Sequence, residues 1–244
     1  MSFWDHLEEL RGTLFRSVLA IVLLSVIFLF IPEQLFKVVL WPTQPDFLLY
    51  RLPGVEFSMD LINIELSAQF FIYLKVSILC GCVLAFPYIV YEIWKFIVPA
   101  LYENEKKAVK TAFTLSSGLF YLGVAVGYFV VLPVCLMFFA NFSVSDAIQN
   151  TISLNSYMSL FTSMVFLIGL LFEFPTVILV LSSLGIVTKP MLKKGRKYAF
   201  VIILILAAFI TPSDPFSMFV LAIPLYGLYE FSIVICKKKP VAEE

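Results

Sequence analysis

The sequence is poor in the side chains that most catalytic and metal sites need. Its 244 residues contain a single histidine, His6, and only 14% of the chain is charged. No H-E-x-x-H, Walker A or G-x-S-x-G sequence occurs, nor a dinucleotide-binding glycine pattern. Acid–base or metal chemistry resting on paired histidines is therefore excluded, and we expect no enzyme activity, no cofactor and no metal.

Cysteine is also scarce, with four residues that all lie within or at the ends of apolar segments: Cys80, Cys82, Cys135 and Cys236. On one helix, Cys80 and Cys82 would point about 200° apart and could not face one partner. We interpret all four as small buried hydrophobic side chains rather than as disulfides or metal ligands.

Apolar residues are abundant instead, because 61% of the chain is hydrophobic. This composition predicts an all-α, polytopic integral membrane protein forming a single membrane domain. We expect six transmembrane helices, over residues 13–31, 70–94, 109–139, 157–184, 198–210 and 216–236. The apolar cores of the last two, 198–210 and 216–229, reach only ~20 Å at the helical rise per residue, so these helices are expected to be short.

Basic residues predict the orientation of these spans. Fourteen of the 17 Lys and Arg residues lie at the N-terminus, in the links after the second and fourth segments, or in the tail. The positive-inside rule then places both termini in the cytoplasm. The acidic start of the chain and the absence of a small-residue cleavage site after residue 31 argue against a cleaved signal peptide.

Three regions outside the spans have distinctive patterns. Residues 1–12 carry an apolar stripe with charges beside it, which predicts a cytoplasmic amphipathic helix that anchors the chain or, through its acids, binds a ligand. Residues 32–67 contain apolar clusters and are expected to fold as a structured outer loop. Residues 94–110 combine two acids with several lysines, which fits either a solvated linker or a binding loop.

Glu173 lies inside the fourth apolar segment, where an ionised side chain costs about 2.5–3.5 kcal/mol on insertion scales. It is either structural, as an ion pair with Lys75 or a protonated carboxyl, or functional, facing a wet cavity or a substrate path. We favour the functional interpretation. Pro175 follows two residues later and is expected to bend the helix.

Four ordered stretches resemble the TatC family, the receptor core of the twin-arginine protein translocase. They are HLEELR at 6–11, FIVPALYENE at 96–105, FEFP at 172–175, and the segment from RKYAF to LYGLYE at 196–230. The resemblance covers nearly the whole chain. It implies a subunit in the bacterial cytoplasmic (inner) membrane that binds twin-arginine signal peptides of folded precursors and exports them with the proton-motive force.

The resemblance also implies site residues and partners. The implied signal-peptide-binding residues are Glu9, Arg11, Phe96, Tyr102, Glu103 and Glu105. Glu173 and Pro175 are the intramembrane functional positions, and Pro212 and Asp214 belong to the outer hairpin. The implied partners are TatA/TatB-type single-span subunits, signal peptides, the lipid bilayer and further copies of the chain, with no nucleic acid.

Two departures from the family pattern stand out: Thr13 replaces a frequent second basic residue after Arg11, and Met218 stands where glutamine is common. The alternative function is a proton-coupled small-molecule secondary transporter with Lys75 and Glu173 as a relay. Such transporters often contain internal repeats, and we find none here.

Overall fold

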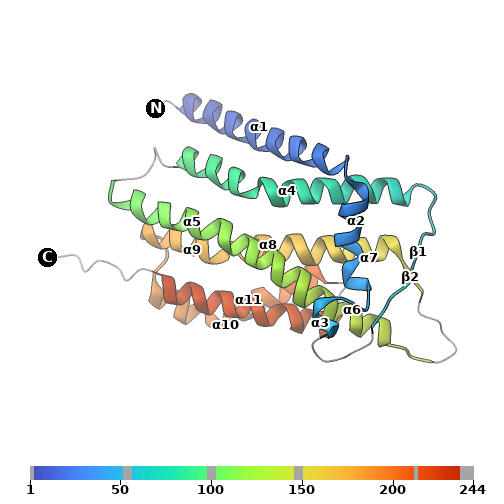
Figure 1. The fold of residues 1–244 in the computed structure, drawn as a ribbon. Helices are drawn as coiled ribbons and strands as arrows, with labels where there is room; N and C mark the ends of the chain where they lie inside the picture. The colour runs from blue at the N-terminus through green and yellow to red at the C-terminus, as the bar shows by residue number, and fades with distance from the viewer. Residues whose placement is uncertain (1–2, 52–56, 98–102, 146–150, 212–213, 237–244) are drawn as a thin grey trace.

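The computed structural model describes residues 3–51, 57–97, 103–145, 151–211 and 214–236, and these are almost entirely helical (Figure 1). The long helices run side by side as a bundle. Helix α1 begins, and helix α11 ends, at the same end of this bundle, on the left of Figure 1. At the opposite end, short helices and two short strands form a cap over the bundle.

Two long helices form one side of the bundle. Helix α1 (Phe3–Phe28) is continuous, so the expected N-terminal amphipathic helix is its first part rather than a separate element. It packs along α4 (Ala68–Ile97). Gly81 of α4 permits this approach, because a Cβ there would clash with the Ser25 side chain and lie 3.0 Å from the Ile21 carbonyl oxygen. Small residues allow such close packing where helices associate in a membrane.

The segment between α1 and α4 folds into the cap. It contains α2 (Pro32–Leu40), η1 (Trp41–Thr43) and α3 (Leu48–Arg51). Phe47 and Tyr50 are buried in it. The strand β1 (Leu61–Ile62) pairs in parallel with β2 (Ile152–Ser153), which joins the two outer segments. The apolar residues of the described part of this segment thus form a packed core.

The middle of the bundle consists of two interrupted helices. One comprises α5 (Glu103–Val126), a π-helical turn η3 (Gly127–Val131) and α6 (Leu132–Asn141). The other comprises α7 (Leu154–Thr162), a second π-helical turn η4 (Ser163–Leu167), α8 (Ile168–Leu171) and α9 (Phe174–Ser183). The two π turns pack against each other, since a Cβ on Gly127 would lie 2.5 Å from the Met164 carbonyl oxygen.

The final hairpin corrects one expectation. Helix α10 (Lys189–Ile210) has 22 residues and α11 (Pro215–Ile235) has 21, so they reach about 33 and 31 Å and are not short. Helix α11 occupies the expected range 216–236, whereas α10 begins nine residues before the expected start at 198. Helix α10 extends through the basic residues before Tyr198, with Pro190 in its favoured first turn, and the single Gly195 does not interrupt it. Glu230 does not end α11, because its carboxylate pairs with Arg196 of α10 at 2.7 Å.

Five helical stretches of the described residues are long and apolar enough to cross a membrane: Leu7–Phe28, Ala68–Ile97, Lys110–Asn141, Leu154–Ser183 and Pro215–Ile235. Helix α10 is not among them, because its first half is basic and its apolar part is confined to residues 198–210. All four cysteines lie in the described residues and none forms a disulfide; Cys135 and Cys236 are buried.

Candidate functional site

The end of the bundle where α1 begins gathers most of the expected binding residues. Glu9 is half-buried and Arg11 is exposed, both in the first turns of α1. Phe96 is half-buried in the last turn of α4, next to the start of α5. In Figure 1, α4 lies between α1 and α5 at this end. The fold therefore brings together sequence segments about 90 residues apart.

Part of this site lies outside the described structure. Tyr102 falls outside the described residues. Glu103 and Glu105 belong to the first turn of α5, but their side chains also lie outside the described part. The positions of the helices thus place the start of α1 and the start of α5 on either side of the end of α4 (Figure 1).

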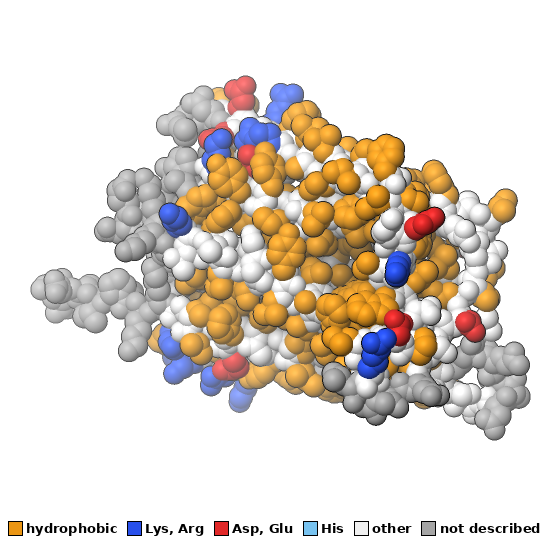
Figure 2. All heavy atoms as spheres, in the orientation of Figure 1, with side chains coloured by type: hydrophobic (Ala, Val, Ile, Leu, Met, Phe, Trp, Pro, Cys, Tyr) orange, Lys and Arg blue, Asp and Glu red, His pale blue; other side chains and the backbone are white. Residues whose placement is uncertain are grey.

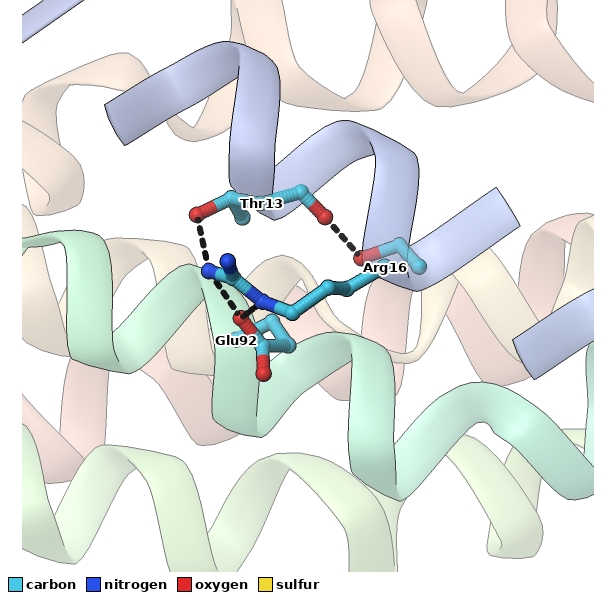
Figure 3. A network of polar contacts seen from close by, with 4 residues as sticks. Thr13, Arg16 and Glu92 are labelled. Carbon is cyan, nitrogen blue, oxygen red and sulfur yellow. Dashed lines mark hydrogen bonds and ion pairs between the residues drawn. The ribbon is translucent and has the colours of Figure 1, made fainter. Parts of the chain in front are cut away.

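An ion pair with a buried carboxylate, which the sequence did not suggest, lies one to two turns further along α1 (Figure 3). The Arg16 side chain reaches from α1 to Glu92 on α4, with Nε and NH2 each 2.7 Å from Oε2 of the carboxylate. The guanidinium also lies 3.4 Å from the Thr13 hydroxyl. Glu92 is 4% exposed. Buried acids almost always need such a partner, because an unpaired buried charge is costly.

The same contact bears on the departure at Thr13. Thr13 is buried against α4, and the Ser17 hydroxyl donates to its backbone carbonyl at 2.8 Å. The Arg16 guanidinium therefore occupies the space beside Thr13. A positive charge is present near this position, but it comes from a residue three positions further along the chain.

The charged side chains cluster at the two ends of the molecule. In Figure 2 acidic and basic groups lie over the left end and over the cap on the right, and hydrophobic side chains cover most of the surface between them. At the left end, the Arg196–Glu230 hydrogen bond raises the pKa of the Arg196 guanidinium, and Glu230 also attracts it electrostatically. This band between two charged ends is the pattern expected of a protein that crosses a bilayer.

A second candidate region is a groove between α4, α5 and α9 with a volume of about 380 Å³. Its walls are apolar apart from three side chains: Ser116, Glu173 and Thr176. The Ser116 hydroxyl donates to Oε2 of Glu173 at 2.7 Å, while Oε1 has no hydrogen-bond partner. A carboxylate oxygen without a partner beside an open groove can accept a hydrogen bond from whatever enters it.

The structural interpretation of Glu173 as an ion pair with Lys75 fails. Among the described residues, no ion pair joins Glu173 to Lys75, and Lys75 is exposed. The first α4 residue lining the groove is Phe86, eleven positions beyond Lys75, which corresponds to about 16 Å along the helix. Lys75 therefore lies toward the cap end of α4, away from the groove.

Glu173 lies at a break in its helix, as Pro175 had suggested. The helix is interrupted at Phe172–Glu173, and α9 starts directly afterwards with Pro175 in its first turn. Proline lacks the amide hydrogen that would continue the helical ladder, so the chain turns there and presents Glu173 to the groove.

At the other end of the bundle, Asp214 has a local structural role. It is the N-cap of α11, and its Oδ1 accepts a hydrogen bond of 2.7 Å from the Ser217 amide. An N-cap aspartate satisfies one of the free amides at a helix start. Pro212 lies outside the described residues. Met218 packs against the core in the first turn of α11.

Comparisons with known proteins give one consistent result. Residues 5–224 match the family model described as Sec-independent protein translocase protein (TatC). The TatC of a Blattabacterium from Periplaneta americana is 39% identical, over 96% of this chain and 94% of that protein. The TatC of Escherichia coli K12 is 32% identical, over 93% of this chain and 85% of that protein. A crystal structure of the twin arginine translocase receptor TatC superposes with a TM-score of 0.80 at 34% identity, covering 95% of this chain and 99% of that one.

Proposed function

This chain belongs to the TatC family of Sec-independent protein translocase proteins, and from that premise we propose that it is the signal-peptide receptor of its translocase. It is a multi-pass protein of the bacterial inner membrane and a non-enzymatic component of protein transport. In our proposal it binds the twin-arginine leader of a folded precursor and passes the precursor across the membrane.

The proposed chemistry is the capture of two guanidinium groups by carboxylates. Charge-assisted Arg–carboxylate pairs are strong and directional, because the planar guanidinium can donate two parallel hydrogen bonds. Glu9 on α1 and Glu105, with Glu103, on α5 supply the carboxylates. Phe96 and Tyr102 belong to the same proposed binding site, and Arg11 orients the start of α1. The observation that supports this most is the convergence of α1, α4 and α5 at one end of the bundle.

The apolar part of the leader would follow the groove between α4, α5 and α9. Its walls are apolar, and Glu173 provides a polar contact in its interior. Transport itself uses the proton-motive force. TatA/TatB-type single-span subunits and further copies of this chain complete the complex.

We propose six spans with both termini in the cytoplasm, counting α10 as the additional span. Helices α10 and α11 pack against each other, and their starts lie at opposite ends of the bundle in Figure 1. The basic residues in the first half of α10 then lie at the cytoplasmic surface, where lysine and arginine side chains extend toward the headgroups.

Leader binding by Glu105 tests this function. We expect Glu105→Ala to weaken binding of an Arg-Arg leader peptide about tenfold, which corresponds to the loss of about 1.4 kcal/mol. A leader with Lys-Lys should bind the parent protein more weakly than the Arg-Arg leader does. Crosslinking yields measured in membranes provide the comparison. Equal yields for the two leaders would mean that recognition does not use these carboxylates.

The transporter alternative finds no support in the structure. A relay between Lys75 and Glu173 needs the two groups close together, and Lys75 lies about 16 Å along α4 from the start of the groove. Uptake of a small solute by liposomes that contain this chain alone would be the observation in its favour.

A further inference from the structure

The Arg16–Glu92 pair joins a fixed carboxylate to a half-exposed guanidinium (Figure 3). The Glu92 side chain is 5% exposed in the contact between α1 and α4, whereas the Arg16 side chain is 42% exposed. The carboxylate therefore cannot move without disturbing the packing of two helices. The guanidinium can leave by rotation of its own side chain.

The guanidinium also points toward the proposed leader site. It lies along the previous turn of α1, where a Cβ on Gly12 would be 3.1 Å from its NH1. Glu9, seven residues before Arg16, lies about 10 Å away along the helix axis. Its carboxylate is among the groups that attract Arg16 electrostatically. Glu92 and Glu9 thus both attract the Arg16 guanidinium.

We propose that Glu92 is a further carboxylate for the leader's arginines and that Arg16 is an internal competitor that occupies it until a leader displaces it. This inference rests on the proposed receptor function. In the free protein the Arg16 guanidinium mimics one leader arginine. On binding, an arginine of the leader takes its place and Arg16 turns outward.

The geometry of the pair favours such an exchange. Both nitrogens of Arg16 contact the same oxygen, Oε2, so the pair lacks the two parallel hydrogen bonds of the strongest Arg–carboxylate geometry. Tyr88 and Lys95, on the same helix, also stabilise the Glu92 carboxylate. A leader arginine that approaches Glu92 end-on can use both oxygens. Since one guanidinium replaces another, the buried carboxylate keeps a positive partner once the exchange is complete.

Competition of this kind lowers the apparent affinity for the leader. The leader must displace a partner that is already bound, so its apparent dissociation constant equals the intrinsic one divided by the fraction of protein in which Glu92 is free. The competition also disfavours a Lys-Lys leader, because a point-charge ammonium replaces a guanidinium poorly. The opposing interpretation is a static clamp between α1 and α4. In that case, removing Arg16 and removing Glu92 have the same effect on leader binding.

The two interpretations differ in the sign of the effect at Arg16. With the full chain in lipid nanodiscs and a fluorescent Arg-Arg leader peptide, we expect Arg16→Gln to lower the dissociation constant roughly three- to tenfold. Glu92→Gln should raise it by a similar factor, and the double variant should behave like Glu92→Gln. Arg16→Lys, which keeps the charge and the fold, should tighten binding by about twofold because an ammonium is displaced more easily.

A matched control is Arg196→Gln, which removes a guanidinium of similar exposure from a carboxylate at the same 2.7 Å distance, but between α10 and α11. It should leave leader binding unchanged. If the parent protein binds Arg-Arg and Lys-Lys leaders equally, the receptor function itself is wrong. If the parent discriminates but neither Arg16→Gln nor Arg16→Lys binds more tightly, the competitor role alone is overturned, and equal weakening by Arg16→Gln and Glu92→Gln would establish the clamp.

Discussion

Glu173 is a half-buried carboxyl group beside an apolar groove, with one oxygen hydrogen-bonded and the other buried. The Ser116 hydroxyl holds Oε2, and Oε1 is left without a hydrogen-bond partner. An unsatisfied polar atom at such a place is expensive to keep. Ser116 and Thr176 are the polar neighbours of Glu173 in the groove and neither is charged, so a ligand in the groove is the simplest reason for retaining the acid.

We therefore expect Glu173→Ala to fold and to bind leader peptides within about twofold of the parent, while export of a folded reporter falls about tenfold. The loss arises because the groove no longer offers a polar contact to the segment that enters it. Export is measured as the fraction of reporter outside the inner membrane. Ser116→Ala, which removes only the orienting hydrogen bond, should have a smaller effect. Full export by Glu173→Ala would return Glu173 to a purely structural role.

Arg16 and Glu92 show what residue-level inspection of the sequence misses. In the sequence, Arg16 was only one of the two basic residues near the N-terminus, and Glu92 lies 76 positions away on another helix. Nothing in the spacing of either residue points to the other. A weak signal exists in retrospect, because Glu92 interrupts an apolar segment just as Glu173 does.

At the scale of the elements, glycines determine how closely the central helices approach. A Cβ on Gly123 of α5 would lie 2.6 Å from the Phe172 ring and 2.9 Å from the Gly169 Cα atom. Gly118, on the same helix, has nothing within 4 Å of the equivalent position. The crossing of α5 with α8 thus depends on Gly123.

We expect Gly123→Ala to destabilise the protein by about 1–3 kcal/mol, because the added methyl group overpacks the crossing. Gly118→Ala is the matched control and should be neutral or stabilising by up to about 1 kcal/mol, since alanine favours a helix. Thermal unfolding in detergent measures both variants. A Gly123→Ala protein as stable as the control would show that the helices can separate freely at this crossing.

Tyrosine hydroxyls attach the cap to the bundle. Tyr128 donates to the Val38 carbonyl and Tyr157 to the Val39 carbonyl, each at 2.6 Å. These carbonyls belong to the last turn of α2, where the Trp41 amide also donates to the Val38 carbonyl. The tyrosine hydroxyls add donors from the bundle and fix the direction of α2.

Tyr157→Phe should therefore destabilise the protein by about 1–3 kcal/mol, because it leaves a buried carbonyl without a partner. Tyr198→Phe, at a position that is 76% exposed, serves as the control and should have no measurable effect. The free energy of unfolding in a chemical denaturant compares them. If both variants match the parent, the cap does not depend on this hydrogen bond.

At the scale of the whole molecule, the arrangement of the ends predicts the topology. Helix α1 begins and α11 ends at one end of the bundle, together with the basic start of α10. With the positive charge inside, a cysteine introduced at Glu244 should resist a membrane-impermeant thiol reagent in intact cells, whereas one introduced at Glu65 in the exposed cap should react. Labelling of the C-terminal position from outside would show that the proposed orientation is wrong.

The sequence by itself determined the class of the protein, the general positions of its helices and its family, because these follow from local composition, charge bias and short motifs. It also indicated the break at Pro175, since proline acts on its own helix. The range expected for the last helix, 216–236, agrees with α11. The sequence underestimated α10, because an apolar run marks the part of a helix within lipid and not the length of the helix.

Only the tertiary structure decided which groups meet. The Arg16–Glu92 pair, the groove around Glu173, its separation from Lys75 and the tyrosine contacts to α2 all join residues that are remote in sequence. Such contacts depend on the rotation and crossing of packed helices, which are set by the close approach at glycines and by the interruption of α5 and α7 by π turns. No local pattern encodes these angles, because they result from the packing of all the helices together.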